Sequence, residues 1–130
     1  MVVDSSAIIA WVQAEREADI VMEAIVEAPS LFMSAFNVFE TKTVLSRRFP
    51  GPGLEQFDMI VENLGMRIVP FDTSQASIAF DAYLRFGRGS GHPAQLNLGD
   101  CAAYALAHSL DLPLLFKGND FIHTDVKSAL

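Results

Sequence analysis

Short apolar runs alternate along this chain with longer segments in which apolar residues recur every three or four positions. The short runs have the length and composition of buried strands and lie at 1–3, 31–33, 66–69 and 113–116. The periodic segments predict helices at 6–11, 16–27, 34–48, 54–64, 73–86 and 98–110. Strands that alternate with helices indicate an α/β fold, in which helices cover both sides of a short, mostly parallel sheet.

Polar residues stand where the helices are predicted to begin. Ser34, Thr73 and Asn97 suit helix N-caps, and Ser5 or Ser6 suits the cap of the first helix. Side chains of this kind accept hydrogen bonds from backbone N–H groups that the first turn leaves free. These residues therefore set the expected starts of four helices.

Two stretches rich in Gly and Pro interrupt the pattern. The first, at 50–53, joins two helices rather than two domains, because each side is too short to fold alone, and we predict one domain over residues 1–130. The second, at 88–97, predicts a mobile surface loop. After the last apolar run we expect a turn and a short final strand at Val126.

Composition and charge limit the function. Hydrophobic residues make up 51% of the 130 residues, so a disordered chain is excluded. The single Cys101 excludes an internal disulfide, no apolar run reaches the length of a membrane span, and the N-terminus lacks a basic lead-in, so we expect a cytoplasmic protein. The net charge of −7 argues against a broad phosphate-binding surface.

Several acids occupy positions that an α/β sandwich gathers at one edge of its sheet. Asp4 ends the first strand, Asp100 lies in the first turn of a helix, and Asp120 follows the last strand. Glu40 lies inside a helix among aromatic residues, where a carboxylate is costly unless it is paired or binds a cation. Structural interpretations remain open, with Asp4 and Asp100 as helix-start charges, Asp120 as a turn residue and Glu40 on a solvated face.

A cluster of carboxylates without His or Cys ligands favours Mg²⁺ or Mn²⁺ over zinc, and the chemistry that follows is hydrolysis of a phosphate ester. The histidines, including His92, lack the spacing of metal motifs. Cys101 has no evident base beside it and is interpreted as a small buried residue.

Four stretches, in this order along the chain, resemble the PIN-domain ribonucleases, and in particular the VapC toxins of bacterial toxin–antitoxin pairs. They are Val2-Val3-Asp4-Ser5-Ser6-Ala7, Ser34-Ala35-Phe36-Asn37-Val38-Phe39-Glu40-Thr41, Leu98-Gly99-Asp100-Cys101-Ala102-Ala103-Tyr104-Ala105 and Leu114-Leu115-Phe116-Lys117-Gly118-Asn119-Asp120-Phe121. The resemblance implies a Rossmann-like sandwich and cleavage of RNA that depends on Mg²⁺ or Mn²⁺ and leaves 5′-phosphate and 3′-hydroxyl ends. It also implies growth inhibition until a VapB-like antitoxin binds, and a homodimer.

The resemblance assigns catalytic and metal-binding roles to Asp4, Glu40 and Asp100. Asp120 is the expected fourth acid, with Asn119 or Asp125 as alternatives. Further residues are expected to support the carboxylates or to contact RNA, namely Ser6, Asn37, Asn119, Lys117, Arg85 and Arg88. Which RNA is cleaved (tRNA, rRNA or mRNA) does not follow from the sequence.

Two alternatives remain at this point. A receiver-like signalling module also has acids at strand exits and a late Lys, here Lys117, but its phosphoacceptor would have to be Asp72, which follows Pro70 and reads better as a helix-start acid. The second alternative is a PIN-like fold that only binds, with a degraded metal site, and the intact acids argue against it.

Overall fold

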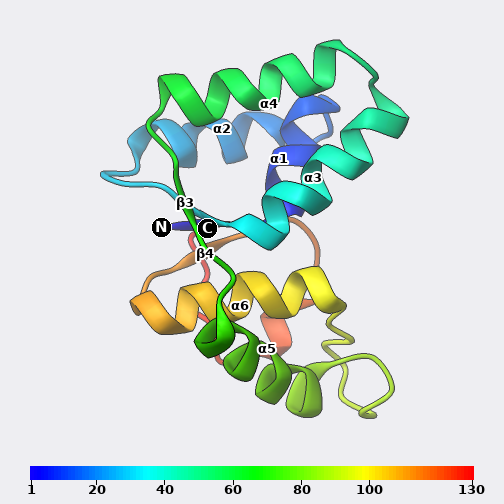
Figure 1. The fold of residues 1–130 in the computed structure, drawn as a ribbon. Helices are drawn as coiled ribbons and strands as arrows, with labels where there is room; N and C mark the ends of the chain where they lie inside the picture. The colour runs from blue at the N-terminus through cyan, green and yellow to red at the C-terminus, as the bar shows by residue number, and fades with distance from the viewer.

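Four short parallel strands form the centre of the fold in the computed structural model, which describes residues 1–130 (Figure 1). They are β1 (Val2–Val3), β2 (Phe32–Ser34), β3 (Arg67–Val69) and β4 (Leu114–Leu115), in the order β3-β2-β1-β4. All three pairings are parallel, and Val2 lies opposite both Phe32 and Leu114. The α/β class with a short parallel sheet is confirmed.

Six helices cover the two faces of this sheet, as Figure 1 shows. Four pack on one face: α1 (Ser5–Val12), α2 (Ala18–Glu27), α3 (Ala35–Arg48) and α4 (Pro52–Asn63). On the other face lie α5 (Thr73–Phe86) and α6 (Leu98–Leu110), together with the short 3₁₀ helix Phe121–His123. None of the helices is long and apolar enough to span a membrane.

Strands β1 and β4 are buried on both faces, and their successive side chains point into different layers. Val2 and Leu114 belong to the hydrophobic cluster shared with α5 and α6. Val3 and Leu115 belong to the cluster shared with the other four helices, where Leu45 and Phe57 are fully buried. Two apolar layers therefore hold the central strands.

Helix starts agree with the sequence at Ser34 and Asn97, whose side chains cap α3 and α6. The prediction of Ser5 or Ser6 as the cap of α1 is wrong, because the carboxylate of Asp4 accepts the hydrogen bond from the Ser6 N–H. In α5 the cap is Asp72 instead of Thr73. In both helices an Asp lies just before the predicted hydroxyl cap. Its carboxylate accepts the backbone hydrogen bond, and a charged acceptor makes that hydrogen bond stronger.

Two other expectations need correction, and one gains detail. Strand β3 is an edge strand with Arg67 and Ile68 exposed, so it is not buried on both faces. No strand forms at Val126, and a single bridge joins Ser128 to Leu114 instead. The loop 88–97 lies mostly at the surface, as predicted, and it is fixed at Ala94 and Leu96, which are fully buried, and by the Leu96 N–H, which donates to the Phe86 carbonyl.

The larger core layer yields a stability prediction. Leu45 on α3 is fully buried, so replacement by Ala leaves a cavity and should lower the free energy of unfolding by about 2–5 kcal/mol. Chemical denaturation measures this difference. Val26→Ala on the exposed side of α2 is the control and should change it by less than about 1 kcal/mol. Equal effects of the two substitutions would contradict this assignment of the core.

Candidate metal centre

The carboxyl ends of the strands bring residues from distant parts of the chain together. Asp4 directly follows β1, and α3 begins directly after β2 and carries Glu40 in its second turn. Helix α6 packs against α3 and begins two residues before Asp100. Three acids predicted from the sequence therefore come from three elements that meet at one edge of the sheet.

The carboxylate of Asp4 is buried and held by one neighbour. Its Oδ2 atom accepts hydrogen bonds from the Ser6 backbone N–H at 2.9 Å and from the Ser6 hydroxyl at 2.5 Å. Burial raises the pKa of Asp4 to about 6, although the bonds from Ser6 lower it, and the nearby charge of Glu40 raises it further. Ser6 therefore fixes the orientation of an acid that its surroundings disfavour in the charged form.

Asn37 connects the acids. Its Nδ2 atom lies 3.5 Å from Asp4 Oδ1, 3.3 Å from Glu40 Oε2 and 3.0 Å from the Gly99 carbonyl oxygen. The side chain is fully buried, and its Oδ1 atom has no hydrogen-bond partner. An amide with two protons and more than two acceptors around it holds β1, α3 and α6 at a fixed spacing.

Glu40 lies directly against the start of α6. Its Oε2 atom accepts a hydrogen bond from the Ser5 hydroxyl at 2.6 Å. A Cβ atom at Gly99 would overlap both carboxylate oxygens of Glu40, so any other residue there would displace the end of this side chain. The sequence analysis did not single out Ser5 or Gly99 for the site, and the glycine directly before Asp100 was the available signal.

Asp100 both caps a helix and belongs to the acidic group. Its Oδ2 atom accepts the Asn97 N–H at 2.8 Å, while Asn97 Oδ1 accepts the Asp100 N–H at 2.9 Å. The pKa of Asp100 is raised to about 7, and burial is the largest cause. The charge of Asp4 raises it further, and the charges of Asp120 and Glu40 make smaller contributions in the same direction. The helix-start interpretation therefore holds for Asp100 without excluding a role in the site.

No positive side chain compensates this group of acids. The four ion pairs of the structure are Lys42–Asp58, Arg85–Asp125, Lys117–Glu15 and Lys127–Asp111, and none includes Asp4, Glu40 or Asp100. Buried carboxylates without a counter-ion, offering only oxygen donors, fit a hard divalent cation. In their present rotamers no three acidic, His or Cys side chains have the arrangement of a metal site, so binding a cation requires these carboxylates to turn toward one another.

The candidates for the fourth acid differ in their surroundings. Asp125 accepts the Tyr104 hydroxyl at 2.6 Å and Arg85 at 3.0 Å, so both of its carboxylate oxygens are occupied. Asp120 is exposed, and its charge acts on Asp100. Asn119 is exposed, and its side chain makes no hydrogen bond within the chain. Of Asp120, Asn119 and Asp125, Asp120 is therefore the candidate whose charge raises the pKa of Asp100.

The cations expected to contact RNA are engaged within the chain. Arg85 pairs with Asp125, and Lys117 pairs with Glu15. Arg88 donates from Nε to the Gln95 carbonyl at 3.3 Å. The backbone N–H of Lys117 donates to the Ser6 hydroxyl at 3.0 Å, which links the end of β4 to the residue that holds Asp4.

Asp72 and Cys101 lie in surroundings that indicate structural roles. The Asp72 carboxylate is exposed and accepts the Gln75 N–H as the cap of α5, which fits its interpretation as a helix-start acid. Cys101 is buried, and burial followed by the charge of Asp100 raises the pKa of its thiol to about 12, so it stays protonated.

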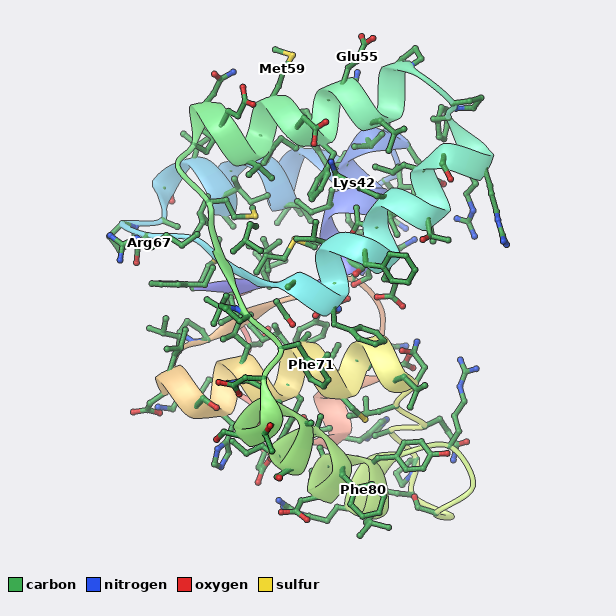
Figure 2. All side chains as sticks on the ribbon, viewed as in Figure 1. Lys42, Glu55, Met59, Arg67, Phe71 and Phe80 are labelled. Atoms are coloured by element: carbon green, nitrogen blue, oxygen red, sulfur yellow. The ribbon has the colours of Figure 1, made fainter.

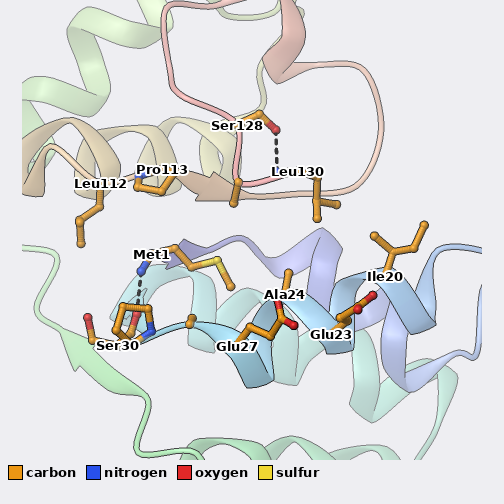
Figure 3. A pocket seen from close by; sticks show the side chains of 13 residues that line it. Met1, Ile20, Glu23, Ala24, Glu27, Ser30, Leu112, Pro113, Ser128 and Leu130 are labelled. Carbon is orange, nitrogen blue, oxygen red and sulfur yellow. Dashed lines mark hydrogen bonds between the residues drawn. The ribbon is translucent and has the colours of Figure 1, made fainter.

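A large hollow lies away from the acids, at the opposite edge of the sheet (Figure 3). It has a volume of about 530 Å³ and lies between α2, the N-terminus and the C-terminal residues. The Met1 amino group there donates to the Ser30 carbonyl, and the Leu130 N–H donates to the Ser128 hydroxyl. The size of a hollow thus does not locate the site in this protein.

Comparison with known proteins shows the family of the chain. The family model "PIN domain" matches residues 1–127. Ribonuclease VapC42 of Mycobacterium tuberculosis is 43% identical over 129 residues, covering 99% of this chain and 98% of that protein. The crystal structure of M. tuberculosis VapC20, described as a sarcin–ricin loop cleaving toxin, matches with a TM-score of 0.78 at 15% identity over 96% and 95% of the two chains. A toxin–antitoxin complex from Klebsiella pneumoniae matches with a TM-score of 0.66 at 19% identity over 92% and 88%.

The contact between Glu40 and Gly99 generates the first prediction for the site. Gly99→Ala should stabilise helix α6, because Ala in place of Gly favours a helical position by up to about 1 kcal/mol. It should also displace the Glu40 carboxylate and therefore reduce the rate of RNA cleavage. Adding Glu40→Asp shortens that side chain by one methylene and should restore part of the lost activity. Activity assays beside thermal melts test this, and an unchanged activity in Gly99→Ala would contradict it.

The raised pKa values generate a second prediction. In the folded chain the pKa values of Asp4 and Asp100 are raised to about 6 and about 7. In an unfolded chain the pKa of Asp is about 4, so both residues bind a proton more tightly when the chain is folded. Their contribution to stability is therefore complete below about pH 4 and is lost as the pH rises through 6 and 7. In chelator-containing buffer the melting temperature should fall between pH 5 and pH 8.

Asp100→Asn should flatten that fall, whereas Asp58→Asn, which removes an exposed acid paired with Lys42, should leave it unchanged. A melting temperature that rises over the same interval in the unmodified chain would contradict the assignment.

Proposed function

The chain belongs to the PIN domain family as a ribonuclease toxin of the VapC type, and we propose that Asp4, Glu40 and Asp100 hold the divalent cation with which it cleaves RNA. The observation that carries this proposal is a group of carboxylates without any counter-ion, in which Asp4 and Asp100 are buried, Glu40 is partly buried, and the charges repel one another. Asp120, whose charge acts on Asp100, is proposed as the fourth member.

Mg²⁺ or Mn²⁺ fits this set because both prefer carboxylate oxygens and retain water. Bound there, the ion would supply a Lewis acid that neutralises the phosphate and activates water. Hydrolysis then forms a bond between the water oxygen and phosphorus and breaks the bond from phosphorus to the 3′ oxygen, which takes up a proton. The products would carry 5′-phosphate and 3′-hydroxyl ends.

The chain's own residues orient the acids for this reaction. Ser6 holds Asp4 through two hydrogen bonds, and Ser5 holds Glu40 through one. Asn37 spaces Asp4 from Glu40 and ties both to the backbone of α6. These hydrogen bonds keep the three acids at one edge of the sheet, and a cation bound there would require their carboxylates to turn toward one another.

Partners follow from the family. VapC toxins act on RNA and pair with antitoxins, and one matching structure is described as a toxin–antitoxin complex. We propose that this chain, as a single PIN domain over 1–130, inhibits growth by cleaving cytoplasmic RNA, forms a homodimer and is neutralised by a VapB-like antitoxin. Arg85 and Arg88, each of which uses only part of its guanidinium within the chain, and Lys117, which pairs with Glu15, are proposed to contact RNA.

Isosteric removal of the acids tests the site. Asp4→Asn and Glu40→Gln should each reduce RNA cleavage by at least roughly 100-fold, since even residues that only support metal ligands contribute 10–100-fold. Asp58→Asn and Glu55→Gln on α4 are matched controls and should cleave normally. Cleavage ends are mapped on total RNA after brief expression, with calorimetric titration of Mn²⁺ alongside.

Full cleavage by either isosteric variant would remove that residue from the site. A chain that neither cleaves RNA nor binds Mn²⁺ would instead support the PIN-like fold that only binds.

A further inference from the structure

The chain offers RNA little positive surface. Its net charge is −7, and four of its nine Lys and Arg side chains are held in ion pairs. Electrostatic attraction to the backbone is the usual source of affinity for nucleic acids. Another interaction beside the acids must therefore contribute to holding the substrate.

The surface next to Glu40 is apolar and hollowed. A pocket of about 390 Å³ includes Glu40 and Gly99 in its wall, together with Phe36, Phe39 and Leu98. Phe39 is 70% exposed and Leu98 is 66% exposed, although both are large hydrophobic side chains. The volume falls within the range of small-molecule sites, about 300–1,000 Å³.

We propose that this pocket binds one unpaired nucleobase of the RNA, stacked on the ring of Phe39 and opposed by Leu98, beside the scissile phosphate. The inference rests on the proposed function and adds a substrate requirement to it, an unstacked base next to the cleaved bond. Recognition of single-stranded RNA uses aromatic side chains in this way, since every base offers a flat face.

A second copy of the chain is the competing occupant. Phe36 and Leu98 also line a second apolar hollow next to this pocket. The second hollow extends to Phe71 and Phe80 on the side of α5 (Figure 2). An apolar protein surface placed over the Phe39 pocket would bury the Glu40 carboxylate without a counter-ion, which is costly. A nucleobase instead brings its phosphate and the cation to that carboxylate, so the position of Glu40 favours RNA.

The test uses a 12-nucleotide RNA that spans a mapped cleavage site, and derivatives with an abasic residue at each nucleotide flanking the cleaved bond. Phe39→Ala should raise KM by about 5- to 150-fold, the range expected for loss of one stacked base, and kcat should change less. Phe39→Trp should keep KM near that of the unmodified chain. Phe80→Ala, which removes a similarly exposed ring outside the Glu40 pocket, is the matched control and should also keep it.

The abasic substrates make the test specific. One of them should raise KM for the unmodified chain, and Phe39→Ala should add no further loss on that substrate, because both changes remove the same contact. Independent losses, or an unchanged KM in Phe39→Ala, would overturn the stacking. Sedimentation of each variant is measured in parallel, and a dimer that dissociates on Phe39→Ala would assign the ring to a protein interface. An unmodified chain that cleaves no RNA would overturn the proposed function, and the stacking with it.

Discussion

Mutual repulsion among carboxylates that are shielded from water is the constraint around which this structure is arranged. Asp4 is buried, Asp100 lies close enough for the charge of Asp4 to raise its pKa, and no Lys or Arg reaches either. Without a cation, such a group stabilises the fold only while it stays protonated. A divalent ion bound among these carboxylates, as proposed above, would offset the repulsion.

The rest of the fold keeps the cluster together. The parallel strands place their carboxyl ends at one edge of the sheet, and helices α1, α3 and α6 begin at that edge. The first turn of each helix has backbone N–H groups that are free to donate hydrogen bonds. Asp4 and Asp100 each use one oxygen to accept such a group, which keeps them at the edge even when protonation changes. Asn37 and Gly99 then set how closely α3 approaches α6, the amide through its contacts and the glycine through its lack of a side chain.

Sequence reasoning reached the order of strands and helices, the caps at Ser34 and Asn97, and the proximity of Asp4, Glu40 and Asp100. The elements and caps follow from local periodicity, and the proximity of Asp4 to Asp100 follows from the rule that parallel strands end at a common edge. Glu40 joined them through its apolar setting and through the resemblance to the PIN-domain ribonucleases. The contact of Glu40 with Gly99, the pairing of Lys117 with Glu15 across 102 positions, and that of Arg85 with Asp125 across 40 were not predictable. Each depends on how packed layers place distant side chains, which no local pattern encodes.

The most direct test of the central claim is a crystal structure of the unmodified chain grown with Mn²⁺, with diffraction recorded at the absorption edge of manganese. The account predicts an anomalous peak coordinated by oxygens of Asp4, Glu40 and Asp100, with these side chains turned toward it. A peak elsewhere on the molecule, or three carboxylates that keep their present hydrogen bonds in the presence of the ion, would contradict it.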